Sequence, residues 1–374
     1  MANCFNPVRI NDMPHEILTQ ASLPWLYSPS SRLTMQIFTD DLHDEIHHLC
    51  RQRLRVLRQV NRRFYWTATR LLYRNIAITV DTHTGDETWI RPGLMSLLDS
   101  NNRAFVQVIK INDKEYASGR SDEMMAKIYE ELPLVLARFP NLRHLTVNFV
   151  GSRMCWPTKD DPPAMAVAAI TKFLQFHAPE NLQALNMCAF EVPLPWKINY
   201  IDFNDVMERL QEFTFESVCH QAANPQPELI QALRRGKSLR RVELAGVRFD
   251  LDGCSNLVHP NAPLQHLWMQ WSALPASWLA SMVNHKETLK GMHLNNIKLT
   301  EGNWAVVFQQ FRSGFNSLTW FTSMDFPEGT CKILYDQFCE HMEETRKRLG
   351  YYEKESTDYV WAAYRQSRGW IYLK

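Results

Sequence analysis

The sequence predicts an α/β repeat protein in which a short strand and a helix alternate along most of the chain. In the stretch from Leu239 to Phe249, apolar residues follow a fixed frame. The second lies three residues after the first, and the third lies two residues after the second. The same frame, which we call a rung, returns 25 residues later at Leu264 and again at Leu289. A fixed period of this size indicates stacked units, none of which buries its apolar face alone. The length of 374 residues also exceeds what one compact core usually reaches.

Composition excludes several classes of protein. Hydrophobic residues make up 45% and charged residues 22%, ordinary values for a folded protein, and the net charge of +1 gives no reason to expect a polyanionic partner. Eight cysteines, none spaced as C-x-x-C, predict reduced thiols in a cytoplasmic or nuclear protein. Met1 to Pro14 contain no apolar run, and no window approaches 18 consecutive apolar residues, so we expect neither a secretory signal nor a membrane span.

Residues 10–80 are predicted to form a helical module that ends in an extended segment. Pro14 can open a helix, and Glu16 lies in its first turn, where a carboxylate complements the helix dipole. A second helix is expected from Leu49 to Tyr73, because apolar residues recur there at helical spacing. Those residues are Leu49, Leu54, Val56, Leu57, Val60 and Phe64. The chain is then expected to be extended over Ile76–Val80.

Both ends of this module resemble an F-box. The run from Met13 to Leu18, M-P-H-E-I-L, resembles the opening of the box, with Met13 in place of its usual leucine. The run from Val56 to Ile76 resembles the closing helix in the form common in fungal F-box proteins, although an insertion between Trp25 and Asp44 sets the two ends further apart than usual. The resemblance implies docking to the linker subunit of an SCF-type ubiquitin ligase. The residues that it implies for docking are Met13, Pro14, Ile17, Leu18, Leu57, Val60 and Phe64.

Three other interpretations of this region stay open. Residues 10–75 would also suit a helical cap that binds nothing. Six arginines between Arg51 and Arg63 would suit contacts to phosphates, but the acidic residues over 40–45 offset their field, and we do not expect a nucleic-acid partner. His43 and His47, with Cys50 nearby, have a spacing that a metal site can use, yet the glutamate is displaced from the metalloprotease position, and we expect no metal.

Residues 94–327 are predicted to be the repeat array. Its rungs start at Val106, Leu142, Leu182, Leu210, Leu239, Leu264, Leu289 and Phe315, and from Leu182 onward the starts lie 25 to 29 residues apart. Helical patterns between the rungs complete a plan that resembles the leucine-rich repeat. This resemblance implies a solenoid, with a parallel β-ribbon on one side and helices on its convex side. The asparagine or cysteine usual after the second turn is replaced by Phe190, Val218, Val247 and Ile297, so we expect turns closed by backbone hydrogen bonds and packing.

The outward positions of the rungs predict a target-binding face. Tryptophan beside arginine and histidine is the usual composition of a binding hot spot. The predicted target-binding residues are Glu212, Arg241, Glu243, His266, Trp268, His293 and Phe321. In the alternative interpretation, Trp268 and Trp271 pack under a neighbouring loop or under the C-terminal tail.

Residues 328–374 are predicted to cap the array with a long helix and an aromatic-rich tail, and the alternative is a tail across the concave face. The sequence contains no glycine-rich phosphate loop and no G-x-S-x-G elbow, so we expect neither an enzyme nor a bound cofactor. The predicted function is therefore a non-catalytic adaptor that holds an unidentified protein substrate for an SCF-type ligase. The alternative is a leucine-rich-repeat scaffold without a ligase link.

Overall fold

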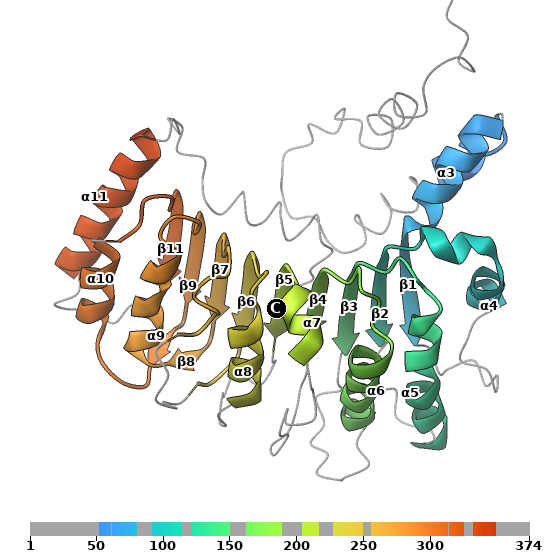
Figure 1. Ribbon diagram of the computed structural model, residues 1–374, viewed down its shortest axis with the longest axis horizontal. Helices are drawn as coiled ribbons and strands as arrows, with labels where there is room; N and C mark the ends of the chain where they lie inside the picture. Colours follow the sequence, from blue (N-terminus) through green and yellow to red (C-terminus); the bar gives the residue numbers. More distant parts are fainter. Residues whose placement is uncertain are drawn as a thin grey trace, which may run out of the picture.

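The computed structural model describes residues 52–60, 62–80, 92–113, 122–149, 162–188, 204–216, 227–249, 256–312, 314–324 and 332–348. These residues form an α/β fold around a nine-stranded parallel sheet whose strand order follows the chain (Figure 1). The strands are β1 (Asn75–Val80), β2 (Val108–Asp113), β3 (His144–Phe149), β4 (Ala184–Cys188), β5 (Glu212–Glu216), β6 (Arg241–Ala245), β7 (His266–Gln270), β9 (Gly291–Asn295) and β11 (Trp320–Met324). Two short strands, β8 (Ala273–Leu274) and β10 (Lys298–Leu299), pair separately.

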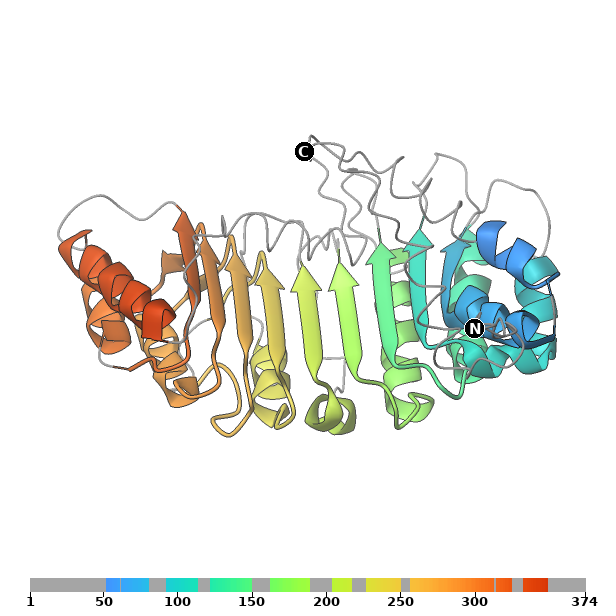
Figure 2. The ribbon, with the colours of Figure 1, turned by 90° about the horizontal axis from the view of Figure 1, so that it is seen from above.

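Helices between the strands lie on one side of the sheet (Figures 1 and 2). They are α4 (Pro92–Asp99), η2 (Asn101–Phe105), α5 (Asp122–Ala137), α6 (Pro162–Phe176), α7 (Asn204–Arg209), α8 (Pro227–Arg235), α9 (Ala276–Ala280), η4 (Ser281–His285) and α10 (Trp304–Arg312). Helix α3 (Arg62–Arg74) precedes the first strand, and α11 (Lys332–Arg348) follows the last. Parallel neighbours need such crossovers, because each strand must return to the edge where the one before it began.

Strand pairing confirms the predicted rung frame over most of the sheet. Leu185 pairs with Leu145 on one side and Phe213 on the other, and the same column continues through Val242 to Leu267. All of these side chains have 0% exposure, since they point toward the helices. Alternate residues of a strand face opposite sides, so the residues between them lie on the other face, which we call the outer face.

The last rung corrects the prediction. Phe321 pairs with Met292, so it belongs to the inward column, and its predicted place on the outer face was wrong. It is 7% exposed and packs edge to face on Phe338 of α11, with ring centroids 4.9 Å apart. The rung begins three residues later than predicted, with Leu318 where Phe315 was expected. The predicted setting fills all three positions with apolar residues, whereas the observed one has Ser323 at the third. The packing of Phe321 into the aromatic core beneath β11 decides between them.

The first strand also differs from the expectation. Residues 75–80 were assigned to the N-terminal module, but β1 pairs along its whole length with β2 and is an edge of the sheet. Helix α3 ends at Arg74 and β1 begins at Asn75, so no residue separates the N-terminal helix from the sheet. Arg70 of α3 also lies over the ring of Phe105 in η2, 5.5 Å from its centroid. The helix is therefore joined to the array both through the chain and through packing.

Backbone hydrogen bonds tie successive units together where the strands start. The carbonyl oxygen of Gln107 accepts from two consecutive N–H groups of the next unit, those of Arg143 at 2.8 Å and His144 at 3.0 Å. The same double acceptance recurs at Arg143, Gln183, Gln211, Arg240, Gln265 and Lys290. Each repeat is thus hydrogen-bonded to the next repeat at the point where the strand of the next repeat begins.

The turns after β6, β7 and β9 close as expected, through the backbone. Gly246, Trp271 and Asn296 occupy equivalent positions and have φ values of 66°, 45° and 51°. The N–H of Gly246 donates to the carbonyl of Gln270, and the N–H of Trp271 donates to that of Asn295, both at 2.9 Å. The left-handed residue turns the chain at each site. The positions at Phe190 and Val218 lie outside the described residues.

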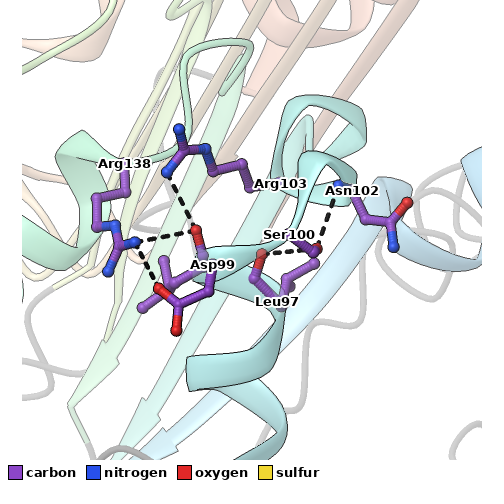
Figure 3. A network of polar contacts seen from close by, with 7 residues as sticks. Leu97, Asp99, Ser100, Asn102, Arg103 and Arg138 are labelled. Atoms are coloured by element: carbon purple, nitrogen blue, oxygen red, sulfur yellow. Dashed lines mark hydrogen bonds and ion pairs between the residues drawn. The ribbon is translucent and has the colours of Figure 1, made fainter.

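A polar network closes the end of α4 near the start of the sheet (Figure 3). Arg103 and Arg138 both donate to the carbonyl of Leu98, at 3.1 Å and 3.0 Å. Arg138, the residue that follows α5, also pairs with Asp99 at 2.9 Å. Guanidinium groups at a helix C-terminus satisfy carbonyls that have no partner inside the helix. The network links the crossover after β1 to the crossover after β2.

Candidate interaction surface

The outer face carries a charged pair at the centre of the sheet. Arg241 donates from Nε to Oε1 of Glu243 at 3.0 Å, with the two side chains 14% and 12% exposed. Both residues lie on β6, two positions apart, and therefore on the same face. Glu212 on β5 is the strand partner of Arg241. The structure thus brings these three predicted residues together.

Three rings form a row beside this pair, which we call the ring row: Trp268, His293 and Trp320. The centroids of Trp268 and His293 are 4.4 Å apart, and His293 stacks on Trp320 at 6.0 Å with an interplanar angle of 9°. Trp268 and His293 are only 4% and 7% exposed. Their burial agrees with the alternative interpretation, in which Trp268 is packed. Trp320 is half-buried and was missed by the sequence analysis, because the last rung had been set three residues early.

Gly291 lets two rings of the outer face come together. A Cβ at this position would lie 3.0 Å from Nδ1 of His266 and 3.1 Å from Cε3 of Trp320. Burial, and then the charges of Arg241 and Lys290, lower the pKa of His266 from 6.5 to about 4. The imidazole is therefore neutral near pH 7, although it lies between basic groups.

A second surface lies at the N-terminal end. Residues 52–57 are helical, and Val56 and Val60 are 62% and 56% exposed. On α3, Tyr65 and Trp66 are 38% and 47% exposed, and Arg58 lies over the Tyr65 ring at 4.9 Å from its centroid. The structure thus leaves four apolar side chains exposed along this short segment.

The predicted docking residues fall differently on this surface. Val60 is exposed, whereas Leu57 and Phe64 are half-buried. The remaining ones, Met13, Pro14, Ile17 and Leu18, lie outside the described residues, and so does the histidine and cysteine cluster of 43–50.

Metal-binding clusters and membrane-spanning helices are both absent from the residues that the structure describes. Within these ranges, no group of three or more His, Cys, Asp or Glu side chains is placed to hold a metal ion. No helix there has both the length and the apolar composition needed to cross a membrane. Models of known protein families and curated protein sequences were both searched with this chain, and nothing matches it.

Proposed function

We propose that this chain is a substrate-recognition adaptor of an SCF-type ubiquitin ligase. In this proposal, the N-terminal segment is an F-box-like module that docks the linker subunit. The sheet and its helices are a leucine-rich-repeat solenoid whose outer face holds the target protein. The chain itself catalyses no reaction, and it works in the cytoplasm or the nucleus.

The exposed apolar surface at Val56 and Val60 is the observation that carries the proposal. It lies in the part of the chain whose sequence resembles the closing helix of an F-box, where a docking partner would cover apolar side chains. A helical cap that binds nothing would gain no stability from leaving these side chains exposed to water.

The repeat plan supports the second half of the proposal. Each strand is followed by a crossover on the same side of the sheet, and neighbouring strands in the sheet are consecutive in the repeat. Among the described residues, this arrangement leaves one broad face of the sheet without helices, which suits binding of another protein.

The proposed mechanism is positioning. A ligase adaptor raises the effective concentration of target lysines near a ubiquitin-loaded enzyme that another subunit supplies. The direct junction of α3 with β1, and the contact of Arg70 with Phe105, hold the docking end in a defined place relative to the outer face.

A double substitution of exposed residues tests the docking. Val56→Asp with Val60→Asp is expected to abolish co-purification with the SCF linker subunit, because it puts two charges into the proposed apolar contact. Since both side chains are more than half exposed, the fold should tolerate the change. Leu134→Asp on α5, where the leucine is 55% exposed, is the matched control and should leave the complex intact.

The outcomes separate the proposal from its alternative. If the double variant keeps the linker subunit bound, the docking assignment is wrong. If the unaltered chain captures a target but no linker subunit, the chain is a repeat scaffold without a ligase link. Circular dichroism of each variant checks that it is folded.

A further inference from the structure

Helix α3, at the N-terminal end of the sheet, carries an exposed tryptophan between two arginines (Figure 1). Arg62, Trp66 and Arg70 follow one another at intervals of four residues, so they lie on one face of the helix. Both arginines are exposed, and the indole of Trp66 is 47% exposed. We call these three side chains the α3 stripe. Tryptophan and arginine are enriched among the residues that contribute most of the binding energy of protein interfaces.

Contacts around the α3 stripe hold it in place. The guanidinium of Arg70 lies over the ring of Phe105, 5.5 Å from its centroid. The ring of Tyr65 packs edge to face on Trp66 with centroids 5.6 Å apart, and Arg58 lies 4.9 Å from the centroid of the Tyr65 ring. A side chain that is already held by its neighbours loses less freedom when a partner binds, so more of the contact energy contributes to affinity.

The charge around the α3 stripe is positive. From Ile46 to Val80 the sequence contains eight arginines and no aspartate or glutamate. The four carboxylates over residues 40–45 can neutralise at most four of these arginines, so eight less four leaves +4, in a chain whose net charge is +1. The excess therefore remains whichever arginines are paired. A partner that covers this surface is expected to bring carboxylates, because complementary charges steer association and like charges oppose it.

The spacing of the α3 stripe defines the shape of the partner. Arg62 and Arg70 are eight residues apart, which is about 12 Å along a helix at about 1.5 Å per residue, and Trp66 lies midway. Side chains at intervals of four residues form a ridge, which packs into the groove of a second helix laid alongside. A partner helix with two carboxylates eight residues apart and an apolar side chain midway matches both the distance and the order of these groups.

We propose that the α3 stripe binds an acidic, amphipathic helix of the linker subunit. The indole of Trp66 lies in the apolar contact, and Arg62 and Arg70 each pair with a carboxylate. The proposal rests on the proposed function in naming the linker subunit as the source of this helix. It extends the docking surface from Val56 and Val60 onto α3, and it adds Trp66, which the sequence analysis did not assign to docking.

Synthetic helices test the chemistry of the α3 stripe with the full chain and without any ligase subunit. The probe is a fluorescent, alanine-based peptide of about 16 residues, a length at which such a peptide is partly helical in water. It carries two glutamates eight residues apart and a leucine midway, and the control peptide has glutamine at both glutamate positions. Fluorescence anisotropy is expected to show binding of the glutamate peptide that is tighter by about tenfold or more. This preference should shrink as ionic strength rises, because salt screens the attraction.

Matched variants locate the binding site. Arg62→Gln with Trp66→Ala is expected to weaken binding of both the glutamate peptide and the purified linker subunit by about tenfold or more. The control, Arg143→Gln with Phe176→Ala, changes an exposed arginine and a phenylalanine that is 71% exposed, and it should keep both affinities. Because all four side chains are exposed, the fold should tolerate each change, and circular dichroism checks this.

Three results would overturn the inference. The first is equal binding of the two peptides. The second is linker binding that the Val56 and Val60 variant loses but the stripe variant keeps, which would leave the proposed function standing. The third is stripe-dependent binding to vesicles that contain phosphatidylserine, without binding of the glutamate peptide, since a basic helix with an exposed indole would then serve a lipid surface. If the unaltered chain binds no linker subunit, the proposed function fails, and the peptide measurements still decide the chemistry of the stripe.

Discussion

Replacing Leu244 by alanine is expected to destabilise the centre of the sheet by about 3 kcal/mol. Leu244 lies on β6, is 1% exposed, and pairs with Phe215 on β5 and with Met269 on β7. Losing about three buried carbon groups removes about 2.4 kcal/mol of transfer free energy, at about 0.8 kcal/mol each, and the cavity left behind adds to this cost. The preceding residue, Glu243, faces the opposite side, so Glu243→Gln, which keeps an acceptor for the Arg241 guanidinium, should cost only about 1 kcal/mol.

Chemical denaturation measures the two free energies of unfolding, and hydrogen exchange locates the effect. Because each repeat contacts only its neighbours, the amides of β5, β6 and β7 should lose more protection than those of β1 to β3. A Glu243→Gln variant as unstable as Leu244→Ala would refute the assignment of the two faces. Uniform loss of protection along all strands would refute the idea that neighbouring repeats hold the sheet together locally.

Two further predictions concern a turn and a histidine. Gly246→Ala should lower the free energy of unfolding by about 1–2 kcal/mol, because φ is 66° there. Gly93→Ala should raise it by about 0.5–1 kcal/mol, because Gly93 lies within α4 and an added Cβ would meet nothing within 4 Å. Equal effects in thermal melts would contradict this reasoning. For His266 the pKa is about 4 when folded and 6.5 in the reference state, so between these values the unfolded chain binds more protons and stability rises with pH. Acidification from pH 7 to pH 4 should cost up to about 3 kcal/mol through this group, and His266→Asn should remove that part of the loss in melts compared at the two pH values.

The strands could be predicted from the sequence because the spacing of apolar residues that indicates them is local. Leu185, Val242 and Leu267 are fully buried at the positions where the rung frame put inward residues. The period repeats within about 30 residues, and apolar side chains at such a period have no other way to leave water than to stack on the next unit.

Contacts between distant segments set the limits of that prediction. The spacing of the frame lets the residue after Leu318 be Trp320, as predicted, or Phe321, as observed. The contact of Phe321 with Phe338, 17 residues further along the chain, decides between the two. The extended residues of β1 were recognised, but the pairing of β1 with β2 depends on contacts that α3 and η2 make around them.

The amino-acid sequence alone determined the repeat period, the inward columns from β2 to β9 and the alternation of strand and helix, because hydrophobic spacing acts over one or two repeats. Tertiary structure alone decided which outer-face groups are accessible. Trp268 and Trp320 lie on the same face in one row of rings, yet Trp268 is 4% exposed and Trp320 is half-buried. Burial depends on everything that packs around a side chain, and spacing along one chain does not contain that information.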